Sequence, residues 1–301
     1  MAFKNFWYPK YNEGNTILIM EGGINAAGDI DCAKRMIALA AVCGFNVIKW
    51  QKRTPRLAVP EDQKNKIKET PDGPMTYLEY KEIVEFSIND CRILLNYAKF
   101  MEIQMSFSVW DMEALSDITS NFTDDIPWIK IPSAKLTDTK LVSETLNWAK
   151  QNSKQILVSC GMSTDREIDE LIQLSKQILG SNFQDLFVIL TCHSAYPADV
   201  HELNLNQINV FKEKYGIKYV GWSNHATRII PTIASVYKGA THVEVHGTLS
   251  RDMWGSDQLS SLEPAGLFNF TSGARLLEFS EGDGVHKLYD SELASRSRLR
   301  G

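Results

Sequence analysis

Short apolar or β-branched runs recur along this chain between longer segments whose apolar residues are three and four positions apart. A short apolar run indicates a buried strand, and the longer spacing indicates an amphipathic helix. Strands are predicted at Thr16–Met20, Asn46–Trp50, Ile103–Ser108, Trp128–Ile131, Gln155–Ser159, Leu186–Thr191, Lys218–Trp222 and Thr241–His246. Helices are predicted at Ile30–Val42, Tyr77–Phe100, Leu141–Gln151, Asp165–Leu179, Leu203–Lys214 and Glu263–Phe279. The alternation predicts parallel strands joined by crossover helices.

The number of predicted strands favours one fold. Eight strands that alternate with helices are typical of a (β/α)8 TIM barrel. An open, doubly wound sheet would fit the same alternation, but no GxGxxG motif follows the first strand and the chain has no P-loop. We therefore predict an α/β protein with a single barrel domain over residues 1–301, in which 1–15 is an N-terminal extension and 280–301 a C-terminal tail.

One long segment, Lys52–Met75, lacks clear periodicity and is rich in charge and proline. In a barrel it would follow the second strand at the catalytic face, where long loops often act as lids. The sequence fits a lid over that face and a mobile surface excursion equally well.

Composition and charge narrow the class of protein. The chain has 301 residues, of which 44% are hydrophobic and 23% charged, so it can bury a large core. Its net charge is −5 and it has no basic run with interleaved aromatic residues, so we expect no nucleic-acid partner. It lacks an apolar stretch of about 18 residues and a signal-like N-terminus, which predicts no membrane segment and a cytoplasmic location. Its five scattered cysteines without CxxC spacing indicate neither a disulfide framework nor structural zinc.

Charged and polar side chains stand at the C-terminal ends of the predicted strands, where barrel enzymes build their active sites. These residues are Glu21, Lys49, Gln51, Lys130, His225 and His246. Because alternate side chains of a strand share a face, Ser223 lies on the side of His225, and Glu244 on that of His246. A single lysine at a strand end is usually a solvated rim residue and a lone histidine is usually structural, but the joint placement of these six residues favours a site. In an apolar barrel interior they need partners, which a bound anion and a metal would provide.

Two of the histidines have carboxylates nearby. His225 and His246, with Glu21, Glu244 and Asp257 as neighbours, suit a divalent transition metal such as Mn²⁺ that keeps positions open for water or substrate. The other histidines lack such company, and we interpret them as structural or surface residues: His193, His201, His242 and His286.

The candidate residues belong to short motifs that follow one another in order. Glu21-Gly-Gly-Ile-Asn25 resembles ExGxNHxG, and Val47-Ile-Lys49-Trp-Gln51 resembles VKFQ. The others are Ile129–Ser133 (KIxS), Val158–Met162 (STGM), Cys192–Pro197 (CTxxYP), Gly221–His225 (GYSDH or GYSGH), Glu244–His246 (ExH), Trp254–Gln258 (GPDH or GSDH) and Ser261–Pro264 (SLEP). Together they resemble the sialic acid (N-acetylneuraminate) synthase family from about residue 16 to residue 300.

The resemblance implies an aldolase-like barrel that condenses phosphoenolpyruvate with an aldose. The aldose would be an N-acylated hexosamine such as N-acetylmannosamine in its open aldehyde form. The products would be a nine-carbon 2-keto-3-deoxy sugar acid, a nonulosonate, and phosphate. The resemblance also implies that His225 and His246 bind Mn²⁺ or Mg²⁺, which polarises the aldehyde oxygen and orients the water that attacks C2 of the enolpyruvyl group. Family members commonly associate, so it allows a homo-oligomer as well.

The same resemblance carries roles over to individual residues. Lys49 and Lys130 would hold the carboxylate and phosphate of phosphoenolpyruvate, and Glu21 would transfer a proton or orient the sugar. Gln51 and Asp257 would contact sugar hydroxyls. The remaining substrate-binding candidates either donate hydrogen bonds or line the pocket: Ser108, Trp110, Ser133, Lys135, Ser159, Ser194, Tyr196, Ser223 and Glu244.

Departures from the family pattern bear on the substrate. Lys135 stands where the family commonly has an acidic residue, Trp110 where many members have phenylalanine, and Asn224 where they have aspartate or glycine. The chain stops at Gly301, about where the linker to the family's antifreeze-like domain would begin. In many members that domain supplies an arginine to the acyl group of the sugar. We therefore expect the acyl contact to come from elsewhere, or the substrate to differ from N-acetylmannosamine.

Two other functions stay open. A synthase of the octulosonate or heptulosonate type would use a phosphorylated aldose, whose phosphate Lys135 could contact. A barrel that has lost catalysis could serve as a binding subunit, although the retained histidines and lysines argue against it. Cys160 and Cys192 lie near strand ends without a base that could activate them, so no cysteine nucleophile is predicted.

Overall fold

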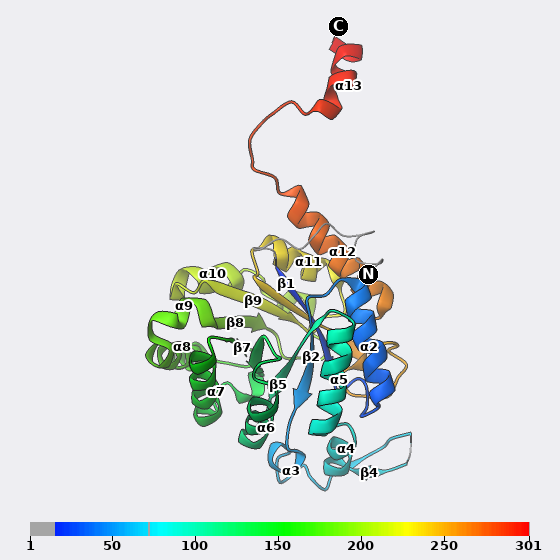
Figure 1. The fold of residues 1–301 in the computed structure, drawn as a ribbon, viewed down its shortest axis with the longest axis vertical. Helices are drawn as coiled ribbons and strands as arrows, with labels where there is room; N and C mark the ends of the chain where they lie inside the picture. Colours follow the sequence, from blue (N-terminus) through cyan, green and yellow to red (C-terminus); the bar gives the residue numbers. More distant parts are fainter. Residues whose placement is uncertain (1–15, 72, 301) are drawn as a thin grey trace.

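Eight parallel strands close into a barrel. The computed structural model describes residues 16–71 and 73–300, so the predicted extension at 1–15 lies outside the described residues. Around the barrel the strands follow the order β1-β10-β9-β8-β7-β6-β5-β2, and β2 pairs with β1 (Figure 1). Their bounds are β1 Ile17–Gly23, β2 Val47–Lys52, β5 Gln104–Val109, β6 Trp128–Ile131, β7 Gln155–Ser159, β8 Phe187–Cys192, β9 Tyr219–Asn224 and β10 His242–His246. Each overlaps a predicted strand, which confirms the (β/α)8 fold.

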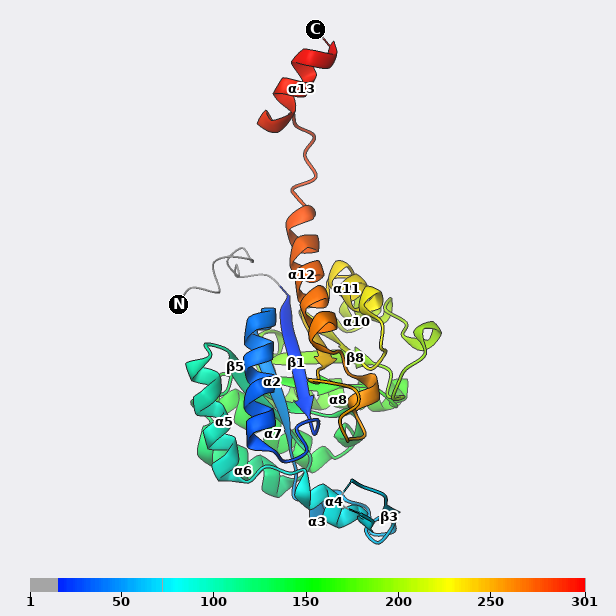
Figure 2. The same cartoon turned by 90° about the vertical axis from the view of Figure 1, so that its right-hand side faces the viewer.

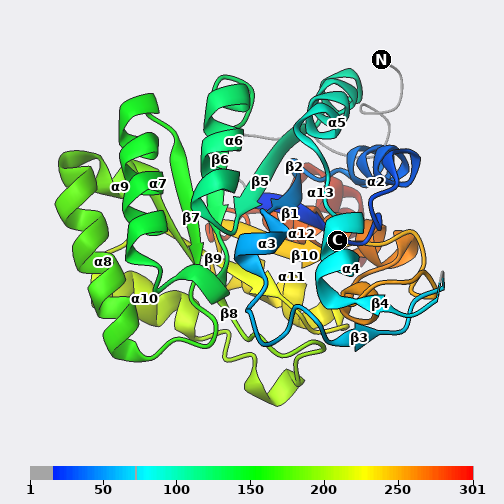
Figure 3. The same cartoon turned by 90° about the horizontal axis from the view of Figure 1, so that it is seen from below.

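Helices surround the barrel and connect its strands (Figures 1 and 3). The longer ones are α2 Ile30–Cys43, α5 Ile88–Phe100, α6 Met112–Phe122, α7 Thr139–Asn152, α8 Asp165–Leu179, α10 Gln207–Tyr215, α11 Ile229–Tyr237 and α12 Pro264–Ser280. Helix α2 shows how the sequence sets their ends. The Asp29 side chain accepts hydrogen bonds from the backbone of Asp31 and Cys32 at its start. Gly44 ends it with a φ of 86°, a conformation that costs glycine little.

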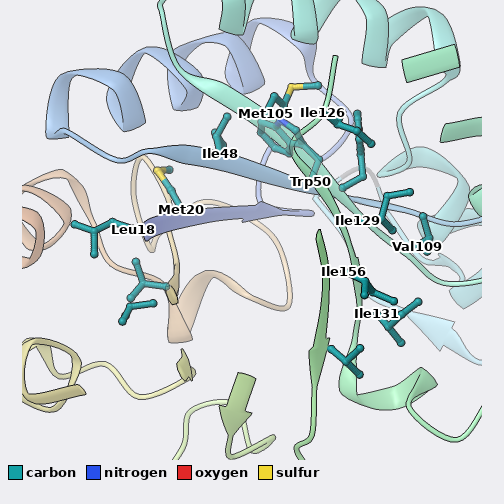
Figure 4. Packing of buried hydrophobic residues seen from close by; sticks show 14 of the residues in the cluster. Leu18, Met20, Ile48, Trp50, Met105, Val109, Ile126, Ile129, Ile131 and Ile156 are labelled. Carbon is teal, nitrogen blue, oxygen red and sulfur yellow. The ribbon is translucent and has the colours of Figure 1, made fainter. Parts of the chain in front are cut away.

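The strands bury apolar side chains on both of their faces. On β1, Leu18 and Met20 pack outward into the large core between strands and helices, part of which Figure 4 shows, whereas Ile19 faces the barrel interior. The interior cluster, called here the apolar layer, consists of Ile19, Val47, Trp128, Leu157, Val188 and Leu190. These residues fill the N-terminal part of the barrel, so any cavity must lie toward the C-terminal strand ends.

The segment after β2 is folded and covers the C-terminal end of the barrel. It contains α3 Pro55–Ala58, the hairpin of β3 Ile67–Lys68 with β4 Met75–Thr76, and α4 Tyr77–Ile83. Figure 2 shows β1 pointing toward the end of the molecule that carries these elements, and Figure 3 views them from that end. Thr54 anchors the segment, because its backbone nitrogen and hydroxyl both donate to Asp111, at 2.6 and 3.0 Å.

The structure corrects two predicted helices. The stretch Tyr77–Phe100 is not one helix but α4 and α5, because Ser87 caps α5 in a reciprocal pair with Asp90 and the chain turns before it. In Leu203–Lys214 the α-helix begins only at α10, after a 3-10 turn at Val200–Glu202.

Several helices lie outside the predicted ones, and one of them stands apart from the barrel. Helices α6 and α11 both have an amphipathic pattern that the predicted helices did not include. Helix α12 extends past the N-terminal end of the barrel, and α13 Asp290–Arg300 lies beyond it with no buried residue (Figures 1 and 2). Within the described residues, no helix combines the length and apolarity needed to cross a membrane.

Candidate active site

Strand register brings the predicted strand-end residues to one level inside the barrel. Glu21 on β1 pairs with His246 on β10 on one side and with Lys49 on β2 on the other. Lys130 on β6 is level with Ser108 on β5. Glu21, Lys49 and Lys130 each stand two positions after a member of the apolar layer, so they point into the same interior one step closer to the C-terminal end.

Four of these residues form a buried ion network that we call the charged layer: Glu21, Lys49, Lys130 and Glu244. Lys49 forms an ion pair with Glu21, and its Nζ lies 3.6 Å from Oε2 of Glu244. Lys130 Nζ lies 2.5 Å from Oε1 of Glu244, which also accepts a hydrogen bond from the hydroxyl of Ser223 at 3.1 Å. Glu244 therefore links both lysines, and the formal charges of the layer sum to zero.

Burial and pairing act against each other in the charged layer. Lys49 is only 2% exposed, and burial lowers its pKa, but the charges of Glu21 and Glu244 outweigh burial and leave that pKa raised. Burial likewise raises the pKa of Glu244, but Lys130 and Lys49 outweigh it and hold that pKa far below its usual range. Both groups are therefore ionised at neutral pH.

His225 is held as a neutral ring. Its Nδ1 lies 2.5 Å from the backbone oxygen of His193, and its Nε2 lies 2.8 Å from the hydroxyl of Tyr196. Burial, followed by the neighbouring His246, lowers the pKa of His225 to about 3. A neutral ring that donates its Nδ1 proton to a carbonyl keeps a lone pair on Nε2 for a proton donor or a metal.

His246 stands beside His225 with one ring nitrogen unpaired. The two ring centroids are 5.5 Å apart. Nδ1 of His246 is buried and has no hydrogen-bond partner within the described part of the chain; its nearest carboxylate oxygen, on Asp257, is 3.8 Å away. An unpaired buried nitrogen of this kind fits a ligand-binding position.

The two histidines fit a metal that takes few ligands from the protein. Over residues 16–71 and 73–300, no three histidine, cysteine or carboxylate side chains form a complete metal site. The neutral ring of His225 and the unpaired nitrogen of His246 supply two nitrogen donors beside a cavity, which suits a divalent ion that keeps water or substrate at its other positions.

A cavity of about 220 Å³ opens above the charged layer. Its wall contains most of the predicted site residues: Glu21, Lys49, Gln51, Ser108, Trp110, Lys130, Ser133, Ser159, Ser194, Tyr196, Ser223, His225, Glu244 and His246. The structure thus gathers residues from all eight strands or the loops that follow them.

Two predicted site residues do not line this cavity, Lys135 and Asp257. Lys135 ends a 3-10 turn at Ser133–Lys135 and is half-buried outside the wall. Asp257 lies just behind the wall: a Cβ added at Gly23 would be 3.3 Å from its Oδ2 and 3.4 Å from Gln51.

One side of the cavity wall carries Ser133, Ser159 and Ser194, and the backbone at Gly161 packs closely against two of these serines. The backbone nitrogen of Gly161 donates to Ser133 at 3.1 Å, and a side chain at Gly161 would collide with Ser194. The hydroxyl of Ser159 is buried without a hydrogen-bond partner in the described residues. This side therefore has room and an unused donor for a polar ligand.

Sequence reasoning missed three residues of the cavity wall, Pro132, Ala134 and Met162. They lie within or beside the motifs Ile129–Ser133 and Val158–Met162, so motif position was the available signal. Met162 has a φ of 61° and is exposed, which places its side chain at the rim.

Comparison with known proteins identifies the family. The model of the NeuB family matches residues 36–286. The chain belongs to the NeuB family. Human N-acetylneuraminate-9-phosphate synthase is 30% identical over 287 residues, which cover 94% of this chain and 76% of that protein. The N,N'-diacetyllegionaminic acid synthase of Campylobacter jejuni is 30% identical over 281 residues, covering 92% of this chain and 80% of that one. The predicted enzyme class, a sugar-acid synthase, is confirmed.

Solved structures agree on the fold. The N-acetylneuraminic acid synthetase of Leptospira borgpetersenii aligns with a TM-score of 0.78 at 24% identity, covering 95% of this chain and 93% of that one. A truncated 3-deoxy-D-arabino-heptulosonate 7-phosphate synthase of Thermotoga maritima aligns with a TM-score of 0.63 at 12% identity, covering 89% of this chain and 88% of that one. Both show that the NeuB chain has the barrel of these proteins.

Proposed function

We propose that this enzyme condenses phosphoenolpyruvate with an N-acetylmannosamine-like aldose to give a 2-keto-3-deoxy sugar acid, a nonulosonate, and phosphate. One observation carries the proposal. Two buried lysines, Lys49 and Lys130, share one cavity with the paired histidines His225 and His246. Two fixed cations suit a small substrate with two anionic groups, and phosphoenolpyruvate has a carboxylate and a phosphate.

On binding, the oxygens of phosphoenolpyruvate would replace Glu21 and Glu244 as the partners of the two lysines. Lys49 and Lys130 bind its two anionic groups, and the unused hydroxyl of Ser159 donates a further hydrogen bond. Ser108, Ser133 and Ser194 on the same wall add donors that need no rearrangement of the backbone.

The charge balance supports a divalent cation. Because the charged layer sums to zero, the substrate would bring uncompensated negative charge into a buried site. His225 and His246 would hold Mn²⁺ or Mg²⁺ there. When bound, the ion supplies extra positive charge and Lewis-acid polarisation of the aldehyde oxygen.

The reaction forms one carbon–carbon bond and, at C2, replaces the carbon–oxygen bond to phosphate by one to the oxygen of water. C3 of phosphoenolpyruvate bonds to the aldehyde carbon and water adds to C2. The bond between C2 and the phosphate oxygen then breaks, which leaves a ketone at C2. One proton of the water goes to the aldehyde oxygen and the other leaves with the phosphate. Glu21 would hold or transfer a proton or orient the sugar, and its carboxylate is oriented by Lys49 at Oε2 and by Gln51, which donates to Oε1 at 3.1 Å.

The aldose would lie over the charged layer toward the rim. Gln51 would contact its hydroxyls, and Tyr196 and Trp110 would supply apolar walls. Asp257 lies behind the wall, so it would contact a hydroxyl only after a shift of the wall residues. The octulosonate-type or heptulosonate-type alternative gains no support from Lys135, which is outside the wall. The alternative of a barrel that has lost catalysis gains no support either, because the cavity keeps its charged layer and both histidines.

The enzyme would work in the cytoplasm. All of its cysteines are free thiols, as expected in a reducing compartment: Cys32, Cys43, Cys91, Cys160 and Cys192. A homo-oligomer stays a prediction.

The test is phosphate release from phosphoenolpyruvate with Mn²⁺, measured across N-acetylmannosamine, mannose, diamino sugars and phosphorylated aldoses. We expect release that depends on one class of aldose and stops on adding chelator. No release with any aldose would overturn the proposal.

A matched pair of variants tests the histidine assignment. His246→Ala should lose chelator-sensitive turnover and keep the melting temperature of the parent, because His246 is at the catalytic end of the barrel. His201→Ala, an exposed histidine outside the cavity, should keep both. Unfolding of the first variant would instead make His246 structural.

A further inference from the structure

Two buried cations lie beside the cavity and have no part in the proposed chemistry. Arg53 follows β2 directly and is 5% exposed. Lys81 belongs to α4, in the segment that covers the C-terminal end of the barrel, and is 7% exposed. Charged side chains are almost never this buried unless a partner offsets the cost.

Arg53 is only partly compensated. Its guanidinium stacks 4.7 Å from the ring of Trp110, which lines the cavity, and its Nε lies 3.3 Å from Glu85. Glu85 is shared, because Lys52 Nζ lies 3.4 Å from it. Nη2 of Arg53 is buried and finds no hydrogen-bond partner among the described residues. One carboxylate thus serves two cations, and Nε of Arg53, despite its ion pair with Glu85, also lacks a hydrogen-bond partner among the described residues.

Lys81 is less compensated still. Its Nζ lies 5.2 Å from the ring centre of Tyr77 and 5.0 Å from that of Tyr80, and no carboxylate forms an ion pair with it in the part of the chain that the structure describes. Burial, and then the charge of Arg53, lower the pKa of Lys81 to about 8, while Asp257 acts in the opposite direction. Contacts place the two cations in one neighbourhood. Lys81 stands four positions before Glu85, the carboxylate that pairs with Arg53. Tyr80, whose ring Lys81 contacts, packs against Trp254 in the loop that carries Asp257.

This neighbourhood adjoins the cavity at two points. At the first point, Trp110 belongs both to the cavity wall and to the stack with Arg53. At the second, Oδ2 of Asp257 lies 3.8 Å from Nδ1 of His246, which is on the cavity wall. The lysines of the charged layer lie deeper in the barrel. Neither Arg53 nor Lys81 is part of the cavity wall, so a ligand with its reacting carbon over that layer would reach them with its far end past Trp110.

We propose that Arg53 and Lys81 form a second anion subsite, which binds a phosphate ester or a carboxylate on the end of the aldose far from its aldehyde carbon. The proposal rests on the proposed condensation, since it takes the aldehyde to lie over the charged layer. An anion there would complete the partners of both cations. The relatives include both kinds of product: the human protein is named for a phosphate-bearing product and the Campylobacter protein for one without, at the same 30% identity.

The test compares aldoses that differ only at the far end. With phosphoenolpyruvate saturating, KM is measured for N-acetylmannosamine, its 6-phosphate and its 6-carboxylate, in the parent and in Arg53→Gln and Lys81→Gln. We expect a charged aldose to be preferred by the parent. Each variant should raise the KM for that aldose roughly 10- to 100-fold, the loss of one charged hydrogen bond. The KM for phosphoenolpyruvate and the turnover of the neutral aldose should stay unchanged, and Lys81→Arg should restore the preference.

Controls separate an anion subsite from a purely structural role of the two cations. Arg56→Gln, an exposed arginine in α3, should change nothing. Equal losses for charged and neutral aldoses would mean that the cations only hold the covering segment in place, and a raised KM for phosphoenolpyruvate would assign them to that substrate; either result overturns the subsite. Preference for the phosphate or for the carboxylate identifies the group.

A binding measurement keeps the two proposals distinguishable. If no aldose is turned over, the condensation fails, and calorimetry with a non-reacting hexitol 6-phosphate tests the subsite by itself. Binding that weakens in Arg53→Gln and returns in Arg53→Lys supports the subsite. Equal binding by parent and Arg53→Gln contradicts it.

Discussion

The two halves of the barrel interior use the same strands for opposite purposes. Ile19, Val47 and Trp128 fill the N-terminal half, and the residues two positions later in each strand are Glu21, Lys49 and Lys130. The first set needs no partner, because burying apolar surface is favourable by itself. The second set is tolerated only as a network in which each charge has an opposite neighbour. On these three strands, the residue that stabilises the core and the residue placed at the site are thus only two positions apart.

The largest expected difference between the halves concerns activity. Lys130→Ala should reduce kcat/KM for phosphoenolpyruvate by a factor of roughly 10² to 10³, the scale for removing one charge-stabilising donor. Glu244 keeps Lys49 and Ser223 as partners, so the barrel should stay folded. Steady-state kinetics and circular dichroism check both parts. Unchanged use of phosphoenolpyruvate would remove Lys130 from the site.

In the apolar layer the effect should fall on stability instead. Leu157→Ala removes a fully buried side chain, and we expect a loss of roughly 2–5 kcal/mol in the free energy of unfolding. Denaturant titration measures this loss, and kcat of the folded fraction should match the parent. A large drop in kcat with intact stability would show that the two halves are not separate.

A buried histidine in the N-terminal half should give a smaller, pH-dependent effect. Burial lowers the pKa of His242 to about 4, whereas the unfolded chain takes up that proton near pH 6.5. The unfolded state therefore binds more protons between these values, and stability falls as pH drops from 6.5 toward 4, by roughly 3 kcal/mol from this group. His242→Leu should flatten the curve of unfolding free energy against pH in that window. Parallel curves for the two proteins would contradict the assignment.

The smallest effect is expected at the exposed surface of the segment after β2, which covers the C-terminal end of the barrel. Arg56 and Glu113 form an exposed pair at 2.7 Å, which solvent screens. Glu113→Gln should change the unfolding free energy by less than about 1 kcal/mol and leave kinetics unchanged. Thermal unfolding checks this, and a loss as large as that of Leu157→Ala would give the segment a role in the core.

Much of the barrel could be predicted because its strands and most of its helices carry local patterns. Strand and helix periods depend on neighbours a few positions away, so runs such as Trp128–Ile131 and Gln155–Ser159 were placed without error. The predicted helix over Tyr77–Phe100 failed at Glu85. This residue leaves the helical path to bind Lys52 and Arg53 on β2 and just after it, a contact that no local period reveals.

The sequence by itself determined which residues would stand at the C-terminal strand ends, because alternation along each strand fixes the side chain's face. Only the tertiary structure decided which of them meet. Glu244 bridges Lys49 and Lys130, the carbonyl of His193 orients His225, and Lys135 falls outside the cavity. Those outcomes depend on barrel closure and strand register, which join residues far apart in sequence, such as Lys130 and Glu244 at a separation of 114 positions. One step of register would have placed different side chains together.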